Sequence, residues 1–238
     1  MKKINLFRTA IIMLIAVFLY SCEKDSSNAV LKFQGINNSS PAKGTAPAEG
    51  VVVESFTINV SEIEFEFDDD DNNGLTYSDI ELKGPFEIDL IENGQAKVVT
   101  LIDDLNLPEK GYDEIEFEFD KNENRNSDMY EKTVLVKGKI DGTDFIFFTD
   151  EEFELEIEFE KPFDLSEVKS VIVTVSFDVY ALFDTAQGGT DITAAQDGNG
   201  DGLIEIYKED PDGNENLANK IKNQLNNIIE AFEDEYDD

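Results

Sequence analysis

The sequence predicts an all-β protein, an antiparallel β-sandwich followed by one C-terminal α-helix. Two observations predict the strands. Apolar and polar residues alternate with a period of two through most of residues 51–183, and turn-forming residues interrupt this alternation about every 8–12 residues. A third observation predicts the helix, because apolar residues recur at spacings of three and four only near the C-terminus.

The chain begins with a segment that has the layout of a signal peptide. Three basic residues precede an uninterrupted apolar run at residues 10–20, which is too short to span a bilayer as a helix of the mature protein. The run ends in Leu19-Tyr20-Ser21-Cys22, which resembles the lipobox of bacterial lipoproteins. That resemblance implies cleavage after residue 21 and acylation of Cys22. An ordinary secretory signal with a chance cysteine is the alternative.

The residues after Cys22 bear on localisation. Glu23-Lys24-Asp25 is acidic and resembles the export signal of surface lipoproteins in some Gram-negative bacteria. We therefore expect an outer-membrane lipoprotein of the cell envelope, exposed at the cell surface, with attachment facing the periplasm as the alternative. A first short strand is predicted at Val30–Ile36. Residues 37–50 are rich in Pro, Ala, Gly and Ser and read as a linker.

The predicted sandwich begins at Val51. Phe56, Ile58 and Val60 share one parity, whereas the next apolar residues, Ile63, Phe65 and Phe67, share the other. One strand keeps both sets on one face only if it contains an extra residue, so a bulge or sharp bend is predicted at Ser61–Glu62. Further strands are predicted near residues 81–91, 97–102, 115–119, 133–140, 145–149, 153–159 and 171–179. Asn93-Gly94 and Asp141-Gly142 fit tight hairpin turns.

Two predicted strands carry rows of glutamates on their outward parity, at residues 114–118 and 154–160. Like charges directly opposite each other on neighbouring strands are destabilising. We therefore expect these rows to avoid being adjacent, or to have cations between them. Lys137 and Lys139 lie on the outward parity of strand 131–140, which is predicted to pair with at least one of the two glutamate-rich strands.

Several stretches between Val51 and Phe183 together resemble a lipoprotein domain family known as domain of unknown function 4382. They are Val53–Val60, Glu87–Leu90, Leu107-Pro108 with Gly111-Tyr112, and the final Val-rich strand. The resemblance implies a β-sandwich of immunoglobulin or prealbumin type. It implies no activity and no catalytic residues.

One stretch of the tail has the oxygen spacing of a calcium loop. Asp197, Asn199, Asp201, the Leu203 carbonyl and Glu205 stand at positions one, three, five, seven and nine, with glycine at six. Position twelve is Lys208, so Glu209, Asp210 or Asp212 would have to supply the remaining ligand. Asp, Asn and Gly are also ordinary turn residues, so a plain turn without metal is the alternative. Bound Ca²⁺ would stiffen the junction to the tail rather than perform chemistry.

After this loop comes the predicted helix. Its apolar stripe is Leu217, Ile221, Leu225, Ile228 and Phe232, with Asp212 or Asn214 as the cap, and we expect the stripe to dock on the sandwich. The final acidic residues 233–238 are predicted to be solvated. The sequence thus divides into a signal peptide (1–21), a tether with first strand and linker (22–50), a β-sandwich domain (51–183), and an acidic turn region with the C-terminal helix (184–238).

The amino-acid composition limits the classes of function that this protein can have. The chain has 54 acidic and 19 basic residues, a formal net charge of −35, one cysteine, and neither histidine nor tryptophan. The large negative charge repels nucleic acid, so it disfavours nucleic acid as a binding partner and favours positively charged partners or divalent cations. A single cysteine excludes an intrachain disulfide, and the absence of histidine excludes Ser-His and Cys-His catalysis and His-ligated zinc.

Three classes of function remain. We expect a non-enzymatic, membrane-anchored surface module with a protein or glycan partner. The alternative is a glycan-binding lipoprotein of a nutrient-uptake system, whose aromatic platforms would come from Tyr77, Tyr112, Tyr130, Tyr180 and Tyr207. An enzyme with paired carboxylates is disfavoured, because exposed carboxylates on strands lack the burial that raises a catalytic pKa.

Overall fold

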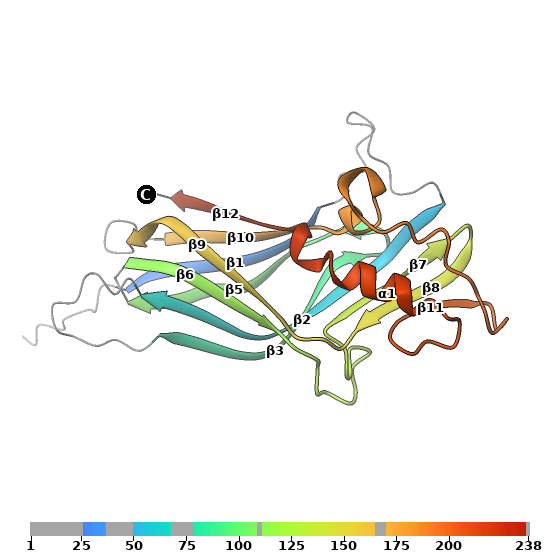
Figure 1. Cartoon of the computed structure of the whole chain (residues 1–238). Helices are drawn as coiled ribbons and strands as arrows, with labels where there is room; N and C mark the ends of the chain where they lie inside the picture. The colour runs from blue at the N-terminus through green and yellow to red at the C-terminus, as the bar shows by residue number, and fades with distance from the viewer. Residues whose placement is uncertain (1–25, 37–49, 68–78, 109–110, 165–169, 237–238) are drawn as a thin grey trace, which may run out of the picture.

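The computed structural model describes residues 26–36, 50–67, 79–108, 111–164 and 170–236. It consists mostly of β-strands arranged in two sheets, with one short α-helix near the C-terminus (Figure 1). The predicted all-β sandwich with a C-terminal helix is therefore confirmed. None of the helices in the described residues has the length and apolarity that a membrane span requires.

The first sheet has four strands in the order β12 (Ile229–Tyr236), β10 (Ser170–Asp178), β1 (Ser26–Ile36) and β5 (Val98–Pro108). β1 is an inner strand of this sheet, since it pairs parallel with β10 and antiparallel with β5. The predicted first strand, together with residues 26–29 of the predicted tether, therefore forms part of the sandwich itself. The parallel pairing also corrects the expectation of a purely antiparallel fold.

The second sheet is built around the long strand β2 (Val51–Phe67). On one side β2 pairs with β3 (Ile80–Glu92), which pairs with β4 (Gln95–Ala96). On its other side the first half of β2 pairs with β7 (Val134–Ile140) and the second half with β6 (Gly111–Phe119). β7 continues to β8 (Thr143–Thr149) and then to β11 (Leu203–Ile206), while β6 continues to β9 (Phe153–Asp164).

The division of β2 coincides with the predicted bulge. The register between β2 and β3 shifts between Val60 and Glu62. Phe56, Ile58 and Val60 are buried before the shift, and Ile63 and Phe65 are buried after it. The extra residue therefore keeps both parity sets on the core side, and the prediction at Ser61–Glu62 is confirmed.

Both predicted hairpin turns are also confirmed. Asn93 and Gly94 have φ of 53° and 73°, and they join β3 to β4. Asp141 and Gly142 have φ of 50° and 86°, and they join β7 to β8. Two successive positive φ values are the signature of the type I′ turn, which matches the twist of the flanking strands.

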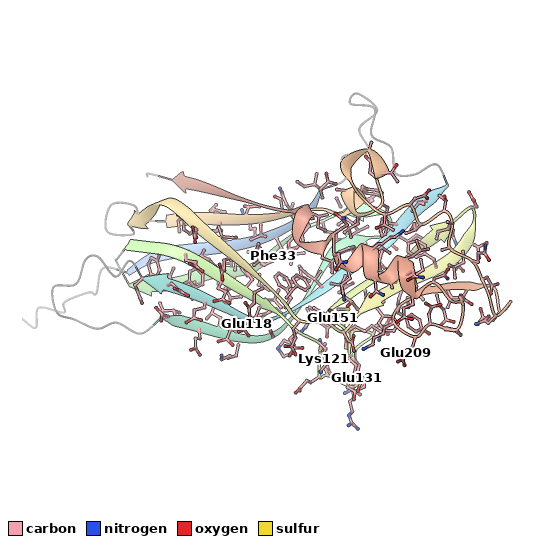
Figure 2. The ribbon with its side chains drawn as sticks, viewed as in Figure 1. Phe33, Glu118, Lys121, Glu131, Glu151 and Glu209 are labelled. Atoms are coloured by element: carbon pink, nitrogen blue, oxygen red, sulfur yellow. The ribbon has the colours of Figure 1, made fainter. Side chains whose placement is uncertain are left out.

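The core lies between the two sheets. Phe33 of β1 is fully buried, and its ring meets Phe117 of β6 edge-on at 5.4 Å and stacks on Phe177 of β10 at 5.8 Å. Figure 2 places Phe33 between the layers. Since Phe117 belongs to the second sheet, this aromatic group joins the two layers.

The C-terminal segment differs from its prediction. Two short 3₁₀ helices, η2 (Val179–Leu182) and η3 (Thr185–Gln187), follow β10. The helix α1 spans only Glu215–Lys222, a 3₁₀ turn η4 covers Leu225–Ile228, and the chain then becomes β12. Ile221, Leu225 and Ile228 are buried as expected.

Phe232, expected at the end of the helical stripe, lies instead in β12 opposite Thr174. Most of the acidic end predicted to be solvated is therefore a paired strand. Pairing with β10 satisfies backbone groups that a frayed helix end would leave open, so tertiary structure overrides the helical spacing.

Candidate functional site

The acidic loop at residues 197–205 leads into β11 and includes its first three residues, at the end of the molecule that carries α1 (Figure 1). Side-chain hydrogen bonds shape it. The Asp197 carboxylate accepts from the backbone N–H groups of Gly200, Asp201 and Gly202 at 2.7, 3.1 and 2.9 Å. Gly200 and Gly202 have φ of 77° and 93°, which an L side chain rarely adopts. Asp197 therefore fixes the fold of the loop.

The structure brings the other predicted ligands to the same turn. The Asn199 amide group donates to the carboxylates of Asp201 and Glu205 at 3.1 and 3.3 Å. Leu203 begins β11, and its N–H donates to Asp201 at 2.9 Å. The Tyr207 hydroxyl donates to Glu205 at 2.6 Å, and this hydrogen bond is the main reason why the pKa of Tyr207 is raised to about 12.

Of the three acids considered for the missing twelfth position, Asp212 reaches the loop. Its carboxylate accepts from the N–H groups of Asn199 and Glu205 at 3.0 and 2.7 Å. Asp210 instead accepts from the N–H of Asn214 at 2.9 Å, while its second carboxylate oxygen is buried without a hydrogen-bond partner. Glu209 is exposed.

Asn214, considered as a helix cap, makes no capping hydrogen bond. It is buried, and its side chain exchanges hydrogen bonds with the backbone of Gln196 and donates to the Glu205 carbonyl. It therefore ties the two ends of the loop together. Among the described residues, three acids with carboxylate oxygens within 4.8 Å of one another occur only outside this loop. The loop thus has the donor types for Ca²⁺, with the Asn199 amide hydrogens between two of the carboxylates.

A second acidic feature covers one face of the second sheet. It consists of outward glutamates of β2, β6 and β9, here called the Glu face: Glu62, Glu64, Glu66, Glu114, Glu116, Glu118, Glu154, Glu156 and Glu158. These side chains stand directly opposite one another in three rows across the strands, for example Glu64, Glu116 and Glu156.

The glutamate rows of β6 and β9 are therefore adjacent, so the first of the two expectations is wrong, while the second, that cations lie between the rows, stays a prediction. The expectation that strand 131–140 pairs with one of them is also wrong, because β7 pairs with β2 and β8. Burial of apolar side chains on the opposite face explains the outcome. Ile115 and Phe117 are fully buried, and burying such a side chain contributes about 1.5–3 kcal/mol, more than the roughly 0.2–1 kcal/mol lost to one facing pair of like charges.

The charges of the Glu face are only partly compensated. At its β3 edge, Lys83 forms ion pairs with Glu62 and Glu81. Burial, followed by repulsion from neighbouring acids, raises the pKa of Glu64, Glu114, Glu116 and Glu118. Glu116 belongs to both triplets of acids whose carboxylate oxygens lie within 4.8 Å of one another, with Glu64 and Glu66 and with Glu118 and Glu154.

The tyrosines considered as glycan platforms separate into two kinds. Tyr112 and Tyr180 are buried in the core, and burial raises the pKa of both. Tyr130 and Tyr207 are half-buried. Tyr207 stacks on Phe148 with 4.3 Å between ring centroids, and Tyr130 and Phe148 line one cavity. Sequence reasoning missed Phe148, although the alternation of β8 places it on the outward parity beside the inward Phe147.

Several predicted features lie outside the described residues. They are the signal peptide 1–21, Cys22, the acidic residues that follow it, the linker 37–49 and Tyr77. No family model matches the chain, and no curated protein or solved structure matches it either. The resemblance to domain of unknown function 4382 therefore stays a prediction.

Proposed function

We propose that the protein is a non-enzymatic lipoprotein of the cell envelope, attached to the outer membrane through Cys22, and that its β-sandwich is a surface-exposed interaction module. The observation that carries this proposal is the position of β1. This strand begins at Ser26, four residues after Cys22, and is held between β5 and β10. An extended chain of four residues spans about 14 Å at most. A lipid on Cys22 would therefore hold the sandwich directly against the membrane.

The strand register then gives the module a defined orientation. Pro108, Ser170 and Tyr236 are linked by pairing to the first residues of β1, so this end of the first sheet would face the membrane. Figure 1 shows α1, β11 and the β7–β8 hairpin at the opposite end. We call these the anchored end and the far end. A partner outside the membrane would meet the far end first.

The acids of the sheets support a non-enzymatic role. On the Glu face, Glu118, Glu154, Glu156 and Glu158 are exposed and the others are half-buried. A carboxyl that acts as a general acid at neutral pH needs an apolar environment that strongly raises its pKa. The open face of a sheet does not provide that environment.

We further propose that loop 197–205 binds Ca²⁺ through Asp197, Asn199, Asp201, the Leu203 carbonyl and Glu205. The alternating donors within one turn support this assignment, because Ca²⁺ takes six to eight oxygen ligands. The Asn199 side chain has to rotate so that its oxygen replaces its amide hydrogens. The ion would then stiffen the far end, and millimolar extracellular Ca²⁺ would suffice.

Cell fractionation tests the anchor. We expect the full chain to sediment with membranes, to be released by detergent, and to yield an N-terminal peptide that begins with acylated Cys22. Cys22→Ala abolishes acylation, whereas Ser21→Ala, which keeps a small residue before the cysteine, does not. Protease added to intact cells should degrade the wild-type module. A soluble mature protein with a free Cys22 thiol would contradict the proposal.

A further inference from the structure

Phe148 forms an aromatic surface near the end of β8 that is remote from the β7–β8 hairpin. Its neighbour Phe147 is fully buried, while Phe148 is half-buried and stacks on Tyr207 with 25° between the ring planes. The Lys132 ammonium lies 5.3 Å from the centre of the Phe148 ring. Burial of the Phe148 ring is therefore incomplete, and partly exposed aromatic rings beside polar groups are common in ligand sites.

Two cavities flank Phe148. One has a volume of about 430 Å³ and is lined by Lys121, Tyr130, Glu131, Lys132, Phe148 and Asp150. The other measures about 260 Å³, and its lining includes Phe148, Asp150, Glu151, Lys208, Asn219 and Lys222. Phe148 and Asp150 line both cavities, so one extended ligand can occupy them together. Figure 2 labels Lys121, Glu131, Glu151 and Glu209 around this region.

The charge of this region differs from that of the rest of the chain. The larger cavity is lined by two lysines and two carboxylates, and in the smaller one Lys222 pairs with Glu151 at 2.6 Å. A protein with a formal net charge of −35 thus presents a nearly neutral surface here, rich in both hydrogen-bond donors and acceptors. Such a lining suits a neutral ligand with many hydroxyl groups. A strongly charged ligand would be repelled by the half of these charged groups that have the same sign as the ligand.

We propose that the two cavities form a binding site for a neutral oligosaccharide. The apolar face of one sugar ring takes the place of the Lys132 ammonium over Phe148, a second packs on Tyr130, and the hydroxyls bond to the surrounding lysines, carboxylates and Asn219. The combined volume falls within the usual range of ligand sites, about 300–1,000 Å³. This proposal rests on the function proposed above in one respect, since it names the partner class of the interaction module.

Affinity electrophoresis tests the site. The purified full chain is run through native gels that contain soluble starch, xyloglucan, galactomannan or laminarin, with polygalacturonate as an anionic glycan. We expect at least one neutral glycan to retard the chain. Phe148→Leu removes the ring but keeps apolar bulk, and should weaken that binding about tenfold. Phe148→Tyr should retain it.

Ile146→Ala is the matched control, because Ile146 lies two residues earlier on the same outward face of β8 and lines neither cavity. It should leave retardation unchanged. Equal loss in Ile146→Ala and Phe148→Leu, binding to polygalacturonate alone, or no retardation by any neutral glycan would each overturn the site. None of these results bears on the proposed lipid anchor at Cys22. Cell fractionation of the Cys22 variants tests that anchor separately.

Discussion

Glu116, at the centre of the Glu face, gives the sharpest test of the electrostatics of this fold. It stands opposite Glu64 on β2 and Glu156 on β9. One facing pair of like charges costs roughly 0.2–1 kcal/mol in a sheet. Glu116→Gln relieves two such pairs while preserving the shape of the side chain. We therefore expect this variant to be more stable by about 1 kcal/mol, which raises the melting temperature by about 2–4 °C for a chain of this size.

The sign of the pH dependence follows from the raised pKa of Glu116, which burial causes first and neighbouring acids second. A carboxyl with a higher pKa in the folded state favours folding when it is protonated. Its contribution is fully present below the unfolded value of 4.5 and is lost as the pH rises through the folded pKa. The stability advantage of Glu116→Gln should therefore be largest near neutral pH and decrease as the pH falls through the folded-state pKa of Glu116. Salt of about 1 M should also reduce it.

Urea denaturation in metal-free buffer measures these differences. Glu54→Gln on the neighbouring strand β2 is the matched control, because the Glu54 carboxylate lies 4.0 Å from the Lys139 ammonium rather than opposite another acid. This control variant should show no increase in the free energy of unfolding, or a decrease of less than about 1 kcal/mol. The reasoning fails if Glu116→Gln is no more stable than Glu54→Gln at neutral pH and low salt. It also fails if the gain is the same in high salt.

Three further predictions concern the loop and the core. Adding Ca²⁺ should raise the melting temperature of the wild type but not of Asp197→Ala or Asp201→Ala, and an equal rise in all three chains would indicate general screening instead. Phe33→Ala should lower the free energy of unfolding in urea by about 3–5 kcal/mol, whereas Val98→Ala at an exposed site should change it by less than about 0.5 kcal/mol. Asn122→Ala removes hydrogen bonds of 3.0 and 2.8 Å from a buried side chain and should cost about 1–3 kcal/mol by the same measurement.

The strands, the bulge and the turns could be predicted from the sequence because each depends on local patterns. Alternation fixes which face of a strand is buried, and the parity change after Val60 requires an extra residue wherever the strand lies in the sheet. Asn93-Gly94 and Asp141-Gly142 carry their own preference for positive φ. These features therefore hold whichever strands become neighbours.

Strand order could not be predicted in the same way. The parallel pairing of β1 with β10 joins residues about 140 positions apart in the sequence, and no local pattern encodes such a contact. The prediction that the Glu rows avoid each other failed because it weighed the repulsion between outward charges without the larger gain from the apolar side chains buried on the opposite face. Phe232 followed the helical spacing but joined β12, since an open edge of β10 competes for the same residues.

The candidate sites also differ in how far the sequence predicts them, according to whether their residues are contiguous or come from distant segments. The acidic loop was predictable because its residues are contiguous, and its spacing alone brings Asp197, Asn199 and Asp201 to one turn. The reach of Asp212 into the loop needed the structure. The aromatic surface combines Tyr130, Phe148 and Tyr207 from three separate segments, and only the fold places them together.

The inner position of β1 has a mechanical consequence. If the lipid is fixed at Cys22 and a partner pulls on the far end, the tension enters the fold along the axis of β1. Hydrogen bonds to β10 on one side and to β5 on the other would then be loaded in shear, all at once, rather than opened one after another. A module built this way would hold its load without peeling from its own anchor.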